Sequence, residues 1–427
     1  MKIFLSKFIF PISSDPIEGG ALAVEKDLIV KCGGAAELRR EFPNAEIVDL
    51  KDAAILPGLV NAQCQLELTH APPYDPADFA LPNGETRFVD WLIRVSQYQD
   101  SLKPHEKRSA LEQGLNSLLH EGVTAAGDHT TYEGAFPSYK ASGLRINGYA
   151  EVMNLNRKLS QDRFESALAW VDEVIAAGDS SSRVRAGLAP YAPYTLSKNL
   201  LKILLQHLKQ LKIPVQIHTS LSFSEMEFFY DSKGEIADAL FPYLGWGEQL
   251  PPPHQKTPIQ YLNSIEFLQL KPTLVGCVHL GPTDLALAAQ GGASVVVRPR
   301  VDATLRLGRS PLRKILKEKI PVGLGSGNLA CNSSLSPWEE MRAALDASAA
   351  DVEPLKADEV LRMATLGGAF ALGRQKEIGS LDKGKFADFL VLRIEEDASP
   401  LTLADHVVRT GNGEKILKRF IGGEEVR

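Results

Sequence analysis

The sequence predicts an α/β fold: a (β/α)8 TIM barrel plus a small β-sandwich domain built from both termini. Between residues 122 and 328, short apolar runs typical of strands alternate with segments of helical periodicity. Such alternation indicates parallel strands joined by crossover helices. Eight units over this length fit a closed barrel better than an open sheet. The two ends of the chain instead carry short alternating runs separated by turns, which is typical of antiparallel strands.

Eight apolar runs are the candidates for the barrel strands, and the helices between them carry start signals. Ser222 and Glu225 match the S-x-x-E capping box, and Pro337 follows Ser336 at a first helical position. We therefore expect each of these helices to begin just after a strand ends. The strand candidates are Ala54–Leu66, Gly122–Thr130, Leu144–Met153, Val184–Tyr194, Ile213–Ser220, Pro272–Leu280, Ala293–Arg300 and Ile320–Asn328.

Neither end of the chain has enough strands to form a convincing domain alone. Residues 1–53 and 376–427 both show turns between short apolar runs. We therefore predict one composite β-sandwich from residues 1–56 and 370–427, and a barrel from residues 57–369.

The composition is that of an ordinary soluble globular protein. Of 427 residues, 44% are hydrophobic and 23% are charged, and the net charge is −6 with no long run of either sign. This balance gives no indication of a positively charged surface for binding nucleic acid or an anionic membrane. No apolar run has membrane-spanning length. The cysteines are widely spaced, which favours a reducing compartment over a disulfide framework. We expect a cytoplasmic protein.

Motifs along nearly the whole chain resemble those of the amidohydrolase superfamily. The run Ile55–Ala62 (ILPGLVNA) resembles the entry to that family's first barrel strand, and Gly187–Thr195 (GLAPYAPYT) resembles its G-x-x-P-H-A-P-Y-T. The segment Gly379–Asp388 is similar to the family's G-S-L-x-x-G-K-x-A-D signature. The branch that the chain resembles comprises cyclic deaminases and chlorohydrolases, especially aminofutalosine-deaminase-like proteins. The resemblance implies hydrolysis of C–N bonds by water that zinc or iron activates.

The same resemblance indicates that the metal-binding positions are degenerate. A family His-x-His pair faces one ion because residues i and i+2 of a strand point to the same side. Gln63 and Gln65 stand there in this chain, and amide oxygens are poor ligands for zinc. His218 matches the third metal-binding histidine, whereas Gly327 stands at the family's aspartate. We therefore expect no bound metal and no other cofactor.

The family's proton-transfer groups are replaced as well. Leu221 stands at the position of a glutamate that shuttles protons, and Gly276 stands at that of a polarising histidine. Neither side chain can carry a proton. Tyr191 replaces the histidine of the P-H-A-P-Y motif, while His279 retains the second histidine of H-C-V-H. We predict that the metal-dependent hydrolysis is lost.

The predicted strand ends still gather polar side chains at one mouth of the barrel. Arg298 precedes Pro299 where the family usually has a small residue, and it offers a site for a carboxylate or a phosphate. An internal ion pair with Asp302 or with a loop carboxylate is the alternative. The positions that we expect to bind a ligand are Gln63, Gln65, Glu67, Glu151, Tyr191, His218, His279, Arg298 and Asn328.

Three functions stay open on the sequence. The first is a non-hydrolytic ligand-binding or regulatory protein, as a homodimer or as a heterodimer with an active paralogue. The second is an enzyme with metal-independent chemistry on a nucleoside-like or carboxylate-bearing small molecule. The third, from the resemblance alone, is a retained hydrolase of non-peptide C–N bonds. Acid–base candidates for the second are His218, Glu151, Tyr191 and His129.

Overall fold

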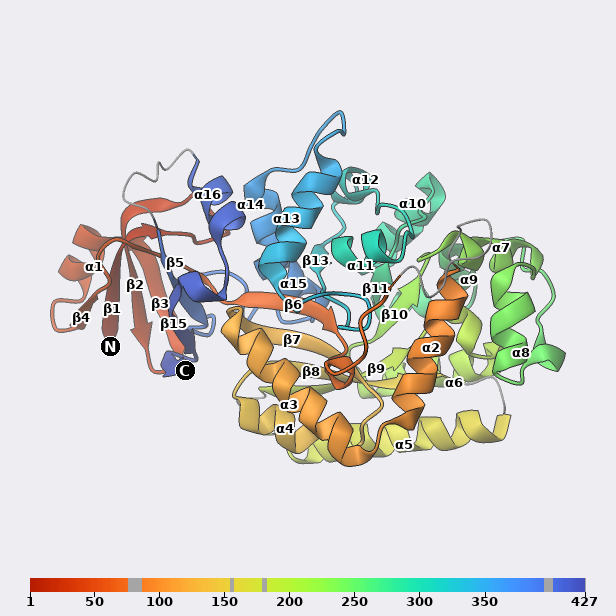
Figure 1. Cartoon of the computed structure of the whole chain (residues 1–427). Helices are drawn as coiled ribbons and strands as arrows, with labels where there is room; N and C mark the ends of the chain where they lie inside the picture. The colour runs from red at the N-terminus through yellow and green to blue at the C-terminus, as the bar shows by residue number, and fades with distance from the viewer. Residues whose placement is uncertain (76–86, 154–156, 179–182, 395–401, 427) are drawn as a thin grey trace.

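A computed structural model describes residues 1–75, 87–153, 157–178, 183–394 and 402–426, and the side chains of 157–161 are left out of the description. The two ends of the chain share one mixed sheet of eight strands, at one end of the molecule in Figure 1. Its order is β16-β15-β14-β5-β1-β2-β3, and β4 pairs with β1. The strands are β1 (Lys2–Ile9), β2 (Ile17–Glu25), β3 (Leu28–Gly34), β4 (Glu46–Asp49), β5 (Ala53–Pro57), β14 (Phe389–Arg393), β15 (Ile416–Ile421) and β16 (Glu424–Val426).

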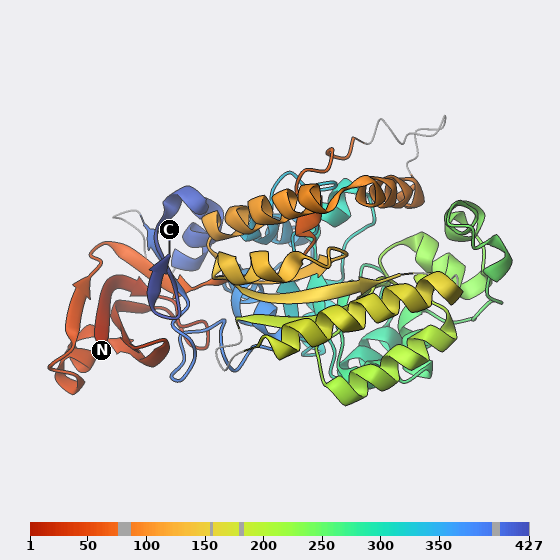
Figure 2. The ribbon, with the colours of Figure 1, turned by 90° about the horizontal axis from the view of Figure 1, so that it is seen from below.

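The remaining strands form two parallel four-stranded sheets. Their orders are β6-β7-β8-β9 and β10-β11-β12-β13, and single bridges join Leu188 to Val215 and Cys64 to Gly327. Helices surround these strands in both views (Figures 1 and 2), which is a TIM-barrel-like arrangement. The strands are β6 (Leu59–Cys64), β7 (Val123–Thr130), β8 (Arg145–Val152), β9 (Val184–Pro190), β10 (Gln216–Thr219), β11 (Thr273–Gly276), β12 (Ser294–Val297) and β13 (Val322–Leu324).

The first predicted barrel strand, Ala54–Leu66, is two strands in the structure. It breaks at Gly58, so that β5 pairs with β14 and β1 in the terminal sheet while β6 pairs with β7. A Cβ atom at position 58 would lie 2.0 Å from Oγ1 of Thr124. Only glycine therefore lets the chain cross at this point from one sheet to the next.

The helices begin where the sequence signals predict, and they cover the barrel strands. Ser197 accepts a hydrogen bond from the backbone N–H of Leu200. The leucines on the core-facing side of this helix are buried: Leu200, Leu201, Leu204, Leu205 and Leu208. The helices are α1 (Ala35–Glu41), α2 (Phe88–Ser101), α3 (Pro104–His120), α4 (Ala135–Ser142), α5 (Arg157–Ala176), α6 (Lys198–Leu211), α7 (Phe223–Asp231), α8 (Phe241–Tyr243), α9 (Pro258–Ser264), α10 (Pro282–Gln290), α11 (Pro299–Thr304), α12 (Leu312–Lys317), α13 (Pro337–Ser348), α14 (Ala357–Arg362), α15 (Gly368–Ala371) and α16 (Leu403–Thr410).

Short helical turns complete the chain. Those of the 3-10 type are Leu66–Leu68, Pro193–Thr195, Gly247–Gln249, Phe267–Leu270 and Gly413–Lys415, and two π-helical turns span Ile236–Leu240 and Met363–Gly367. Among the described residues, no helix combines the length and the apolar character needed to cross a membrane.

The predicted capping box of α7 closes one residue earlier than expected. The hydroxyl of Ser222 accepts from the backbone N–H of Glu225, as the motif requires. The carboxylate of Glu225 accepts from the backbone N–H of Leu221, at 2.8 Å. The loop between β10 and α7 is thereby fixed by its own side chains.

A buried ion pair ties the terminal sheet to the barrel. The Nε and Nη2 groups of Arg145, at the start of β8, donate to the two carboxylate oxygens of Asp388 at 2.6 and 3.0 Å. Both side chains are 2% exposed, and the ring of Phe386 lies 3.8 Å from the guanidinium. Asp388 also accepts from the backbone N–H of Gly422. The carboxylate is therefore paired and hydrogen-bonded, as a buried charge must be.

Candidate functional site

The candidate site lies at the carboxyl ends of the barrel strands, where His218 on β10 meets Arg298, the residue after β12. Nη1 of Arg298 lies 3.3 Å from Nε2 of His218. Nδ1 of the same histidine lies 3.2 Å from the carbonyl oxygen of Tyr191 and can only donate to it. The ring proton therefore belongs on Nδ1, and Nε2 accepts from the guanidinium.

His218 is a neutral histidine in this environment. Its side chain is 6% exposed, and burial together with the positive charge of Arg298 holds its pKa well below the usual value. The ring of Tyr191 packs 5.0 Å from it and that of His129 packs 5.3 Å from it. Two of the other three acid–base candidates, Tyr191 and His129, thus pack against His218.

His129 lies fully buried beside this histidine. Its Nε2 bonds to Oε1 of Gln216 at 2.9 Å, and its Nδ1 has no hydrogen-bond partner. Burial lowers the pKa of His129 to about 4, so the ring is neutral at physiological pH. Gln216 also donates to the carbonyl oxygen of Ala62. The sequence reasoning missed Gln216, although it lies two residues before His218 and therefore on the same face of the strand.

Arg298 is buried without an acidic neighbour in contact. It is 5% exposed, its Nε has no hydrogen-bond partner, and no ion pair joins it to a carboxylate within the part of the chain that the structure describes. The predicted alternative, an ion pair with Asp302, is wrong. Asp302 lies one turn along α11, where one carboxylate oxygen has no partner and burial raises its pKa to about 7.

The two glutamines at the metal positions have different surroundings. Gln65 donates to a carboxylate oxygen of Glu151 at 3.2 Å and accepts from Nδ2 of Asn328 at 3.0 Å, so these three side chains form one chain. Gln63 is buried, and its Oε1 has no hydrogen-bond partner. Its Nε2 reaches only the carbonyl oxygen of Cys64, at a long 3.5 Å. Gln63 therefore keeps an amide available to a ligand.

Glu151 is a carboxyl with a strongly shifted proton affinity. Burial, followed by the negative charge of Glu67, raises its pKa to about 8. A large fraction of this group is therefore protonated at pH 7, when it can donate as well as accept a hydrogen bond. Burial also raises the pKa of the Tyr191 phenol.

Two of the predicted ligand-binding residues are occupied by other protein groups. The carboxylate of Glu67 accepts from the backbone and hydroxyl of Thr131 and from Nε2 of Gln99, at 2.5 to 3.3 Å. Nε2 of His279 bonds to the carbonyl oxygen of Leu307. These contacts fix the loops beside the mouth.

The replaced proton-transfer positions are packed against each other. Gly276 has φ +100°, and a Cβ atom there would lie 2.7 Å from Cδ1 of Leu221. Leucine thus fills the space that a side chain at position 276 would need. At Gly327, where φ is +64°, a Cβ atom would lie 4.0 Å from Nη1 of Arg298 and 2.9 Å from Cγ2 of Val301.

The transition-metal donors of the mouth are few. Over residues 1–75, 87–153, 157–178, 183–394 and 402–426, no three His, Cys, Asp or Glu side chains are grouped so that they could hold a metal ion. Both ring nitrogens of His218 already face other groups. Asp128, another potential ligand, accepts from the hydroxyl of Tyr139 and the backbone N–H of Leu66.

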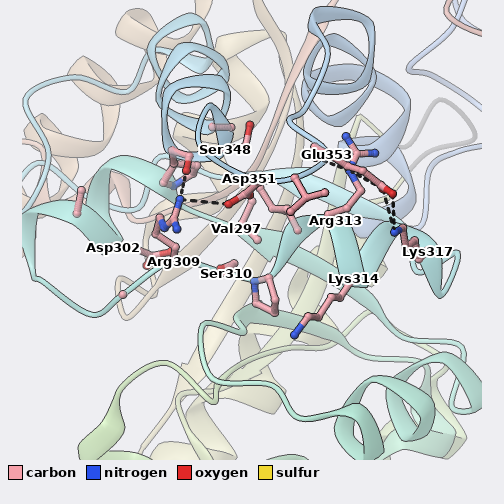
Figure 3. A pocket seen from close by; sticks show the side chains of 18 residues that line it. Val297, Asp302, Arg309, Ser310, Arg313, Lys314, Lys317, Ser348, Asp351 and Glu353 are labelled. Atoms are coloured by element: carbon pink, nitrogen blue, oxygen red, sulfur yellow. Dashed lines mark hydrogen bonds and ion pairs between the residues drawn. The ribbon is translucent and has the colours of Figure 1, made fainter.

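A separate cavity of about 570 Å³ lies between α11, α12 and α13 (Figure 3). Asp302 is on its wall, and the other charged residues around it are Arg309, Arg313, Lys314, Lys317, Asp351 and Glu353. Glu353 pairs with Lys317, and Arg309 pairs with Asp351. Sequence patterns do not predict this cavity, because its wall joins residues from three helices.

Comparison with known proteins agrees with the fold and with the motifs. A model of the amidohydrolase family matches residues 54–426. A 5-methylthioadenosine/S-adenosylhomocysteine deaminase from Moorella thermoacetica is 27% identical over 393 residues, which cover 91% of this chain and 84% of the relative. A 5'-deoxyadenosine deaminase from Methanococcus maripaludis is 24% identical, over 92% of this chain and 87% of the relative.

Solved structures with the same fold include two deaminases. Helicobacter pylori aminofutalosine deaminase, in complex with methylthio-coformycin, superposes with a TM-score of 0.84 at 19% identity, and all of each chain is covered. An adenosine deaminase from Xanthomonas campestris with bound zinc gives a TM-score of 0.79 at 21% identity, over 99% of this chain and 92% of the other.

Proposed function

Because this chain belongs to the amidohydrolase family and to its deaminase-like branch, we propose that it is a non-hydrolytic member that binds a small molecule at the barrel mouth. The observation that carries this proposal is the contact of 3.3 Å between Nη1 of Arg298 and Nε2 of His218. A fixed guanidinium charge here repels a divalent cation from the one retained metal-binding histidine, and the repulsion is strong in a buried site.

The donor chemistry of the mouth does not fit zinc or iron. Gln63 and Gln65 offer neutral amides, and Gly327 offers no side chain at all. Zinc sites in proteins use imidazole, thiolate or carboxylate ligands, and one histidine cannot hold the ion alone. Leu221 and Gly276 likewise leave no titratable side chain at the family's glutamate and histidine positions.

The same residues are suited to holding a polar ligand. Gln63 has a free amide oxygen, Gln65 connects Glu151 with Asn328, and Tyr191 stacks beside His218. Amides and an aromatic ring recognise a nucleobase, a sugar or an amide by hydrogen bonding and stacking. In this proposal the mouth keeps the family's recognition role without the metal step.

Metal analysis of the purified protein tests the proposal. We expect well under one zinc or iron per chain after expression in medium supplemented with both metals. We also expect no deamination of adenosine, 5'-methylthioadenosine or S-adenosylhomocysteine, with or without added zinc. One zinc or iron per chain, or activity that a chelator abolishes and zinc restores, would contradict the proposal.

A retained deaminase is the second candidate. The observation in its favour is the similarity to 5-methylthioadenosine/S-adenosylhomocysteine deaminases over about nine tenths of the chain. The metal analysis separates it from the first candidate. A metal-independent enzyme would instead rely on Glu151, whose pKa of about 8 suits proton transfer near neutral pH.

We also infer the division and the assembly of the chain. A closed barrel of residues 57–369 is supported by the bridges at Leu188 and Cys64, and a separate β-sandwich of 1–56 and 370–427 is supported by the sheet that both ends share. We propose a homodimer, or a heterodimer with an active paralogue, in the cytoplasm, where the four free cysteines stay reduced. Analytical ultracentrifugation, alone and with the paralogue, tests the assembly.

A further inference from the structure

The buried guanidinium of Arg298 lacks a negative partner. The structure describes one polar contact for it, the neutral ring of His218, and its Nε–H has no acceptor. Asp302, the acidic side chain nearest in sequence, forms no ion pair with it. An arginine cannot escape this situation by losing its proton, because its pKa is too high.

Burying a charge without a partner costs free energy, which a bound anion would offset. The groups around Arg298 determine whether an anion can bind there. On one side of Arg298 lies Gly327, whose Cβ position would be 3.8 Å from Cδ of the arginine. Gly327 is hydrogen-bonded through its backbone N–H to the carbonyl oxygen of Gln63. The free amide of Gln63 and the guanidinium therefore belong to adjacent residues of the mouth.

Some side chains of the mouth keep part of their surface exposed. His218 and Arg298 are almost buried yet keep a few per cent of their surface exposed, and Glu151 and Tyr191 beside them are partly exposed. A glycine at position 327 keeps the space next to the guanidinium free of a side chain. An oxyanion entering here would meet the N–H donors of Arg298. Of the described acidic groups in this region, Asp302 forms no ion pair with Arg298, and Glu151, with its pKa of about 8, is largely protonated at pH 7.

We propose that Arg298, with the Nε2–H2 group of Gln63 as a second donor, binds the carboxylate or phosphate group of a small-molecule ligand. A guanidinium with a free N–H edge matches the planar arrangement of two oxygens in such a group. The inference rests on the proposed function, because it places an anion where metal-dependent relatives would need a cation. It adds the chemical class of the ligand, which the fold and the relatives do not specify.

Thermal unfolding in different anions tests the inference. Acetate and inorganic phosphate are compared with sodium chloride at matched ionic strength, for the wild type, Arg298→Met and Arg309→Met. We expect acetate, phosphate or both to raise the Tm of the wild type by about 2–4 °C at about 100 mM. The more effective anion indicates whether the ligand carries a carboxylate or a phosphate. Arg298→Met should lose the rise.

The Arg309→Met variant is the matched control. It removes the same charge from the exposed rim of the other cavity, and it should keep the full rise. No rise in the wild type, or an equal rise in Arg298→Met, would overturn the inference. So would a rise that disappears only in Arg309→Met, since the anion then binds in the cavity between α11, α12 and α13.

A crystal soaked in selenate provides a test that does not depend on a variant folding. We expect an anomalous selenium peak within hydrogen-bond distance of Arg298 and Gln63. A peak only elsewhere, or a protein carboxylate from outside the described residues seated on Arg298, would refute the inference. Zinc is measured in the same sample, so that failure of this inference is distinguished from failure of the proposed function. A metal-free protein without an anion effect contradicts only the anion site.

Discussion

The guanidinium of Arg298 lies 3.3 Å from Nε2 of His218, so a permanent charge faces the histidine that the sequence motifs predict at a metal-binding position. The two residues are 80 positions apart and come from different strand ends. Nδ1 of the histidine donates to the carbonyl oxygen of Tyr191, which leaves Nε2 as an acceptor for the arginine. In the proposal above, this contact places an anion-binding group beside a predicted metal-ligand position.

Removing this charge should stabilise the protein when no binding anion is present. We expect Arg298→Met to raise the free energy of unfolding by about 1–3 kcal/mol in chloride buffer, because a buried charge without a partner is replaced by an apolar chain of similar length. Urea unfolding followed by circular dichroism measures the change. Arg309→Met, at an exposed position, should stay within about 0.5 kcal/mol of the wild type. A loss of stability in Arg298→Met would mean that the arginine has a partner within the protein.

Restoring the family's ligands should not restore metal binding while Arg298 is present. The variant Gln63→His, Gln65→His, Gly327→Asp regains two imidazoles and a carboxylate around His218. Its new aspartate would start 4.0 Å from Nη1 of the arginine, and we expect it to pair with that cation. Zinc content should approach one per chain only when Arg298→Ala is added. Stoichiometric zinc in the variant that keeps Arg298 would contradict the antagonism between guanidinium and metal.

Leu221 and Gly276 should behave as a coupled pair. Gly276→Ala places a Cβ atom 2.7 Å from Cδ1 of Leu221 at a residue with φ +100°, so we expect it to cost about 2–4 kcal/mol. Leu221→Ala opens the space, and the double variant should recover about 1 kcal/mol relative to the sum of the single effects. A double-mutant cycle by chemical unfolding measures this coupling. Strict additivity would show that the two sites do not share packing space.

The stability should fall with pH below 6.5, in part through His129. The pKa of this ring is about 4 in the folded protein and near 6.5 when unfolded, so the unfolded state takes up the proton first. Its contribution is present in full above pH 6.5 and is lost as the pH falls to 4, by about 3 kcal/mol. The difference between the wild type and His129→Gln across this window isolates the contribution. An unchanged pH profile in His129→Gln would show that the ring titrates normally.

The positions of the strands follow from local pattern, whereas the pairing of the site residues does not. Each predicted strand contains an observed one, because apolar runs and turn residues act over short range. The split of Ala54–Leu66 at Gly58 depends on Thr124, a contact that lies far along the chain. A single sequence therefore does not indicate which strand belongs to which sheet at this junction.

The contacts of the candidate site residues differ from expectation for the same reason, because they depend on residues far along the chain. Glu67 is held by Thr131 and Gln99, so it stabilises the loops instead of facing a ligand. The charge of Arg298 was evident from its replacement of a small family residue, yet its neighbour proved to be His218 and not Asp302. Arg298 precedes α11 at the end of β12, and this strand-end geometry places its guanidinium against His218.

The salt bridge between Arg145 and Asp388 sets the order in which this chain is able to mature. The arginine is made early and is enclosed by the barrel, but its counter-charge emerges from the ribosome 243 residues later. Until then the first barrel sheet, β6-β7-β8-β9, has a cation whose burial is costly. A chain that stops before Asp388 is therefore left with Arg145 enclosed and without its counter-ion.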